Sequence, residues 1–270
     1  MDITSGVEAQ PAATQTAGNP ALRFAGAAVA LAFRIVPERH RFGIALLAAR
    51  CLEPLIRRTS AYAERSKLHT DDLREISLDL LLLMLTRHGT TFTPRLQVQP
   101  LEYLPPPGAG PILVVSPHTM LSMLFLRYLE DRGYEPFVIA AYPGLRTPGT
   151  RLPARVLDPS AALLLKVRRL LRDGATVTAM IDRDRPERRN AEYQISAGRL
   201  FVSDALLQLA LQHDAHVVFL ATRLDERSCI VFNLGSPSRL AADVIGLAAE
   251  FAGFVDHTLT LPAGAPDPRA

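Results

Sequence analysis

Apolar residues cluster in three stretches near the start of the chain, which predicts helices over about 21–35, 38–58 and 71–88. The third helix has the clearest ends, because Thr70 can cap its first turn and Gly89 can stop it. Its centre, LLLLML, is apolar nearly all round. A helix of that kind is buried on more than one side, so we expect it to lie inside the protein.

From residue 96 onward, short apolar runs alternate with helical segments. LQVQ alternates apolar and polar residues as a half-exposed strand does. The other expected strands are PILVVS, PFVIAA, ATVTAMID, HVVFLATRL and SCIVFNLG. The expected helices cover about 119–132, 160–173, 199–212 and 238–257. Strands and helices in alternation predict an α/β fold, with a mainly parallel central sheet and helices on both faces.

Composition divides the chain into a leader and one domain. Residues 1–20 combine proline, threonine, glutamine and glycine with few apolar side chains, which is typical of a disordered segment. We expect residues 21–270 to form a single domain, because that length is enough for one sizeable core. Residues 21–90 are then its helical N-terminal subregion and residues 91–270 its α/β core.

Charge is unevenly distributed along the chain. The formal net charge is +3, yet residues 23–67 contain nine basic residues against three acidic ones. Such a region favours phosphate groups on lipid or nucleic acid, although a solvated charged face explains it as well. No segment reaches the ~18–20 uninterrupted apolar residues of a membrane span. The closest, 21–36, is bracketed by Arg23 and Arg34, and suits an interfacial helix or a plain buried one.

The sequence argues against metal and nucleic-acid binding. Cys51 and Cys229 are far apart and lie in apolar surroundings, so we expect a reducing compartment with neither a disulfide nor a metal framework. No cluster of histidine, cysteine and aspartate has the spacing of metal ligands. Few aromatic residues interleave the arginines and no known binding module is present, so nucleic acid is not the expected partner.

Polar residues follow two of the expected buried strands. His118 comes after PILVVS, and Asp182 ends ATVTAMID. Because ligands bind at the carboxyl ends of parallel strands in open α/β folds, these side chains are candidates for a site. Arginines near the same edge can hold an anionic substrate, namely Arg146, Arg151 and Arg155 in one loop and Arg183 and Arg185 in DRDRPERR. A core histidine and a solvated arginine surface are the plain alternatives.

Three sequence motifs follow the basic helices in a fixed order, namely ILVVSPHTMLSM, LLRDGATVTAMIDRD and ISAGRLFVSDALLQLALQHDAHVVFLATRLDE. Over about 25–235 this order resembles the lipid A late acyltransferases, the lauroyl and myristoyl transferases of the lysophospholipid acyltransferase superfamily. The resemblance implies an acyltransferase-like domain. It would move a fatty acyl group from a thioester of acyl carrier protein or coenzyme A to a hydroxyl or amine of a lipid or glycolipid.

The resemblance also implies partners and a location. The acyl thioester is a co-substrate, and no cofactor, metal or nucleic acid is expected. Anionic membrane lipid is the other expected partner, bound peripherally at the cytoplasmic face of the inner membrane. A thioester or ester hydrolase is a close chemical alternative, in which water replaces the acceptor.

The resemblance assigns roles to individual residues. His118 matches the family's general base, and Asp182 matches the acid that ends a later strand. Substrate-binding residues are expected among the arginines and methionines near them, namely Arg146, Arg155, Arg183 and Arg185 for the anionic acceptor and Met120 and Met123 for the acyl chain.

One position departs from the family pattern. The family has His followed, after four residues, by Asp or Glu, and here Met123 takes the place of that acid. Three outcomes stay open. His118 works alone and slowly, Asp182 reaches it from another strand and rebuilds the pair, or the protein is a catalytically silent lipid-binding subunit.

Overall fold

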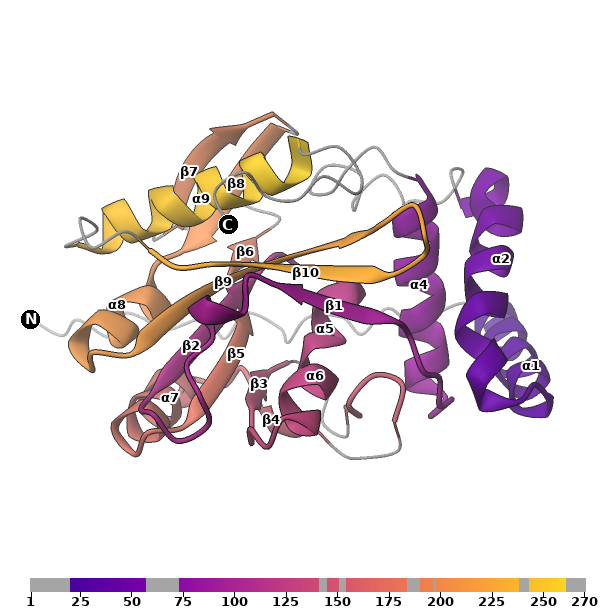
Figure 1. Cartoon of the computed structure of the whole chain (residues 1–270), viewed down its shortest axis with the longest axis horizontal. Helices are drawn as coiled ribbons and strands as arrows, with labels where there is room; N and C mark the ends of the chain where they lie inside the picture. Colours follow the sequence, from indigo (N-terminus) through magenta and orange to yellow (C-terminus); the bar gives the residue numbers. More distant parts are fainter. Residues whose placement is uncertain are drawn as a thin grey trace, which may run out of the picture.

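The computed structural model describes residues 20–56, 73–140, 145–150, 154–183, 190–196, 198–237 and 243–260. Its first helices are α1 (Pro20–Ile35), α2 (Glu38–Ile56) and α4 (Leu73–Arg87), which confirms the three predicted helices to within a few residues. They lie together at one end of the molecule (Figure 1). The predicted disordered leader lies outside the described residues, apart from Pro20 at the start of α1.

Seven strands of the described chain form the central sheet. In spatial order they are β1 (Leu96–Gln99), β10 (Ile230–Gly235), β9 (His216–Leu224), β2 (Ile112–Ser116), β5 (Thr176–Met180), β3 (Phe137–Ile139) and β4 (Arg155–Leu157). All neighbours run parallel except β9 and β10, which a short turn joins directly. The predicted α/β class with a mainly parallel sheet is therefore confirmed.

The helix predicted over 199–212 is partly wrong. Its first residues form β8 (Gly198–Ser203), which pairs with β7 (Asn190–Ile195) and β6 (Asp182–Arg183) in a second, antiparallel sheet. Burial alternates along β8 as it does in a strand, since Leu200 and Val202 are buried and the residues between them are not.

The helix continues only as α8 (Ala205–Gln212). The helix predicted over 119–132 is divided at Leu124 into α5 (Met120–Met123) and α6 (Phe125–Asp131). Strands β4 and β7 fall in segments that the sequence pattern leaves as loops.

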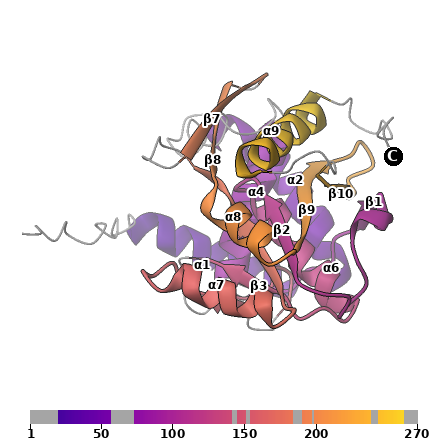
Figure 2. The ribbon, with the colours of Figure 1, turned by 90° about the vertical axis from the view of Figure 1, so that its left-hand side faces the viewer.

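Strand β2 is buried on both faces, and its side chains point alternately into two separate parts of the core. Ile112 and Val114 belong to the cluster shared with α1, α2, α4, α5 and α6. Leu113 and Val115 belong to the cluster on the other face, with α7 (Leu163–Arg172), α8 and α9 (Val244–Thr260). Helices thus cover both faces of the sheet (Figure 2). The carboxyl end of β2 is held in the middle of the fold.

The two N-terminal helices expose apolar side chains as well as burying some. Leu31 and Ile35 on α1 are 61% and 84% exposed, and Leu47 on α2 is 61% exposed. Among the helices that the structure describes, none combines the length and apolar character needed to cross a membrane.

The loop at 145–150 is anchored to α6 and to the segment after α4. The Phe92 amide donates to the Gly149 carbonyl at 3.1 Å, and Arg127 donates to the Phe92 carbonyl at 2.7 Å. Thr147, fully buried, donates to Glu130 at 2.8 Å. Burial raises the pKa of the Glu130 carboxyl, and this hydrogen bond offsets part of the rise.

Gly149 is expected to be indispensable for this anchoring. Its φ is +79°, and a Cβ there would lie 2.7 Å from the Phe92 carbonyl oxygen. Gly149→Ala should lower the free energy of unfolding by about 3 kcal/mol, from a left-handed conformation costing roughly 1–2 kcal/mol plus the backbone clash. Gly108→Ala is the matched control, because φ is +80° with open space around it. If chemical denaturation shows the same loss of unfolding free energy for both variants, the backbone clash at Gly149 makes no contribution.

Candidate functional site

His118 and Asp182 follow the neighbouring parallel strands β2 and β5 at the same level. In the register of β2 and β5, Ser116 lies opposite Met180. Each member of the candidate pair comes two residues after one of these partners. Parallel pairing therefore places them side by side at the carboxyl edge of the sheet, where open α/β folds bind ligands.

The two side chains are joined by a short hydrogen bond. His118 Nδ1 lies 2.5 Å from Asp182 Oδ1. The histidine side chain is 49% exposed, whereas that of Asp182 is 0% exposed. A buried carboxylate next to Nδ1 favours the tautomer with the proton on Nδ1, so that Nε2 remains available as an acceptor. This is the arrangement in which a carboxylate orients a histidine base.

Asp79 of α4 fixes the backbone just after His118. Its Oδ1 accepts from the Thr119 hydroxyl and from the Leu121 amide, both at 2.9 Å. Thr119 itself caps α5, because its hydroxyl accepts from the same amide at 3.1 Å. One turn earlier on α4, the buried Glu75 accepts from the Leu224 amide at the end of β9.

Sequence reasoning missed both of these acids. The signal that could have found them is their spacing of four residues within a helix that is otherwise largely apolar, which places them on one face. That face meets the segment after β2 and the end of β9, so α4 positions the candidate site as well as filling the core.

Removing the Asp79 carboxylate is expected to loosen the histidine turn. Asp79→Ala should lower the free energy of unfolding by about 1–3 kcal/mol, because one buried and one half-buried donor lose an acceptor. Asp79→Asn keeps an acceptor oxygen and should lose less. Asp131→Ala is the control, since that exposed acid makes only a surface pair with Arg127 at 3.7 Å. Thermal unfolding compares the three; an Asp79→Ala protein as stable as Asp131→Ala would contradict the assignment.

Two of the predicted arginines, Arg155 and Arg146, lie away from the pair. Arg155 begins β4, level with Phe137 and Val177, and so lies toward the amino ends of the strands. It is exposed and donates to Glu135 at 2.7 Å. Arg146 lies beside Gly89, just after the far end of α4. The structure therefore brings neither Arg155 nor Arg146 to His118.

The other two arginines are less completely described. Arg183 contributes its backbone to β6, directly after Asp182, but its side chain lies outside the described part of the chain. Arg185 lies wholly outside it. The expectation that these two arginines bind an anionic acceptor therefore still rests on the sequence alone.

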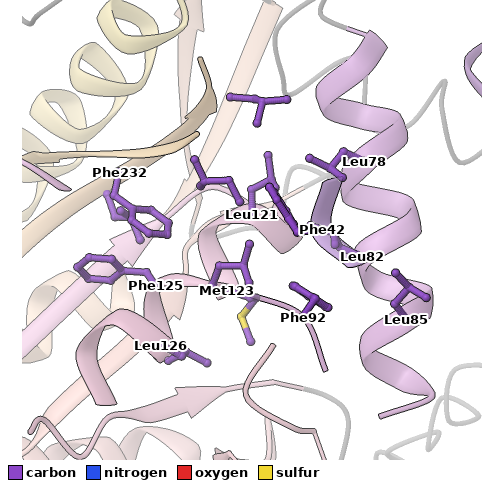
Figure 3. Packing of buried hydrophobic residues seen from close by; sticks show 14 of the residues in the cluster. Phe42, Leu78, Leu82, Leu85, Phe92, Leu121, Met123, Phe125, Leu126 and Phe232 are labelled. Atoms are coloured by element: carbon purple, nitrogen blue, oxygen red, sulfur yellow. The ribbon is translucent and has the colours of Figure 1, made fainter. Parts of the chain in front are cut away.

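Met123 is a core residue. It is 8% exposed and packs among the side chains between α4, α5 and the sheet (Figure 3). It lines a cavity of about 20 Å³ that is bounded by Ser116, Phe125 and Leu220, among others. That space holds about one water molecule and is far too small for an acyl chain. The Met120 side chain lies outside the described residues, so its expected role toward the acyl chain stays a prediction.

Restoring the family's acid at position 123 is expected to harm the protein without helping it. Met123→Glu would bury an unpaired carboxylate, at a cost of roughly 3 kcal/mol or more. No gain in turnover should follow, because Asp182 already occupies the position beside Nδ1. Met123→Leu, which conserves volume, should cost less than about 1.5 kcal/mol. Melting temperatures of the two variants test the cost, and any turnover that is faster in Met123→Glu than in the unmodified protein would overturn the expectation.

No protein-family model and no curated protein matches the chain. Among the described residues, no group of three or more histidine, cysteine, aspartate or glutamate side chains is placed to hold a metal ion. The site holds the half-exposed ring of His118 against a buried carboxylate, which orients the ring and leaves it accessible to solvent. Chemistry that removes a proton from an attacking hydroxyl or water suits this arrangement.

Proposed function

We propose that the protein is an acyltransferase that moves a fatty acyl group from a thioester of acyl carrier protein or coenzyme A to a hydroxyl of a lipid or glycolipid acceptor. The observation that carries the proposal is the pairing of His118 with Asp182 at the carboxyl edge of the sheet. The order of motifs that resembles the lipid A late acyltransferases supplies the substrate class.

In the proposed reaction His118 Nε2 takes the proton from the acceptor hydroxyl as its oxygen attacks the thioester carbonyl. The C–O bond forms, the C–S bond breaks, and the imidazolium returns the proton to the leaving thiolate. Asp182 stabilises the charged imidazole in the intermediate and fixes the ring. Because the carboxylate is buried, its attraction for that charge is screened less than it would be in water.

The pair favours catalysis over the silent lipid-binding alternative. A protein that only binds lipid has no need of a buried carboxylate directed at an exposed imidazole. Burying a carboxylate costs free energy unless it is partnered, and here the partner is a titratable side chain at a strand end.

Thioester hydrolysis is the second candidate, and the exposure of the His118 side chain favours it. A ring that is 49% exposed admits water as readily as an alcohol. The same base and the same carboxylate serve both reactions, and only the acceptor differs.

A product assay decides between the three. The protein is incubated with radiolabelled lauroyl-coenzyme A, with and without a lipid A precursor that has free hydroxyl groups. Label in the acceptor supports acyl transfer, and label in free fatty acid alone identifies a hydrolase. Thioester that stays intact with this donor and with lauroyl acyl carrier protein would overturn the proposal in favour of a silent subunit.

For location, we propose peripheral attachment to the cytoplasmic face of the inner membrane through α1 and α2. Exposed Leu31, Ile35 and Leu47 suit insertion among acyl chains, and the neighbouring arginines suit anionic head groups. Fractionation of cells should then recover the protein with membranes and release it in high salt.

A further inference from the structure

A second cavity, about 360 Å³ in volume, lies at the far end of α4 from the histidine pair. It is lined by Arg34 of α1, Arg41 of α2, Arg146 of the anchored loop, and His88, Gly89, Thr90 and Thr91 after α4. Its volume falls within the roughly 300–1,000 Å³ of small-ligand pockets. From Asp79 beside the histidine turn, α4 rises about 13 Å to His88, so the two sites are separate.

Hydrogen bonds within the fold hold the arginines in place. Arg41 donates to the carbonyls of Val36, Thr91 and Arg34 at 2.8, 2.9 and 3.2 Å, so its guanidinium is fixed. Arg34 donates to the His88 carbonyl at 3.2 Å. These four bonds go to neutral carbonyl oxygens, and Arg41 also donates to the Thr91 hydroxyl at 2.5 Å, so none of them neutralises the charge of Arg34 or Arg41.

Within the described residues, neither Arg34 nor Arg41 has a carboxylate at ion-pair distance. Glu38 accepts from the Thr91 and Thr93 hydroxyls at 3.3 Å, and the Thr91 hydroxyl links it to Arg41. The guanidinium groups of Arg34, Arg41 and Arg146 line one space, and no acid is among the lining residues that the structure describes.

We propose that this cavity binds a phosphate group, with Arg34, Arg41 and Arg146 as its cationic side chains. Guanidinium groups bind phosphate oxygens through charge-assisted, often bidentate hydrogen bonds, and the Thr90 hydroxyl adds a neutral donor. The inference stands on the cavity alone and goes beyond the proposed acyl transfer.

The phosphate can belong to a lipid head group or to a soluble molecule. Ile35, 84% exposed, follows Arg34 directly, which suits a phosphate presented at a lipid surface. The experiment therefore needs one arm for each source.

Binding of inorganic phosphate to the full chain is measured by titration calorimetry, and binding to phosphatidylcholine vesicles with or without phosphatidic acid by co-sedimentation. Arg34→Gln and Arg146→Gln should each weaken phosphate binding on the order of tenfold, because each removes charge-assisted hydrogen bonds. Arg199→Gln is the control with the same change in charge, since Arg199 lies on β8 and pairs with Glu192. Circular dichroism verifies folding, and Arg146→Lys should retain part of the affinity.

Saturable binding of soluble phosphate that Arg34→Gln and Arg146→Gln both weaken supports the site. Binding only to vesicles with phosphatidic acid, weakened by the same two variants, also supports it and identifies a lipid as the source of the phosphate. Equal losses in Arg199→Gln, or no binding in either arm, would overturn it. His118→Ala should bind phosphate as the unmodified protein does, so a failure of acyl transfer leaves this measurement unaffected.

Discussion

Replacing His118 by alanine is expected to lower acyl transfer by about 10²–10⁴-fold, the contribution of a positioned general base. The ring is the group that can take the hydroxyl proton, and its removal leaves Asp182 buried behind an empty space. Initial rates with lauroyl-coenzyme A at saturating acceptor measure the effect.

His216→Ala is the matched control for that experiment. His216 is also exposed, but it begins β9, opposite Ile112 at the start of β2, and so lies at the other edge of the sheet. Its loss should change the rate less than twofold or so, as a surface substitution does. A His118→Ala protein that keeps the full rate would remove the proposed base.

Replacing Asp182 by asparagine should be as damaging, with a loss on the order of 10⁴-fold by analogy with the serine-protease triad. The side chain keeps its shape, so the expected loss is chemical. An amide that donates to Nδ1 selects the wrong tautomer, and an amide oxygen that accepts from it cannot stabilise the imidazolium.

Asp158→Asn serves as the control, because that aspartate also follows a parallel strand, β4, but is exposed. Combining His118→Ala with Asp182→Asn should be no worse than the histidine change alone, since the two residues act as a unit. If the two losses of rate multiply in the double variant, Asp182 contributes to the rate independently of His118.

Local pattern was enough for most elements and for both members of the pair. The runs before His118 and Asp182 are apolar and bounded by turns, and that alone identifies strands with polar ends. The pattern failed at 199–203, where the apolar run from Leu200 to Val202 is too short to distinguish a strand from a helix end. It also failed at 119–132, where Leu124 ends one short helix and begins the next.

The sequence by itself determined the α/β class, the helices that precede the sheet, and the chemical identity of the candidate base and acid. Tertiary structure alone decided that β2 and β5 are neighbours in parallel register, which puts His118 against Asp182 although 64 residues separate them. It also decided that Met123 packs in the core, that Arg155 lies toward the opposite edge, and that Arg34 and Arg146 line one cavity. Periodicity is a property of neighbouring residues, whereas strand order and register depend on pairing between distant segments.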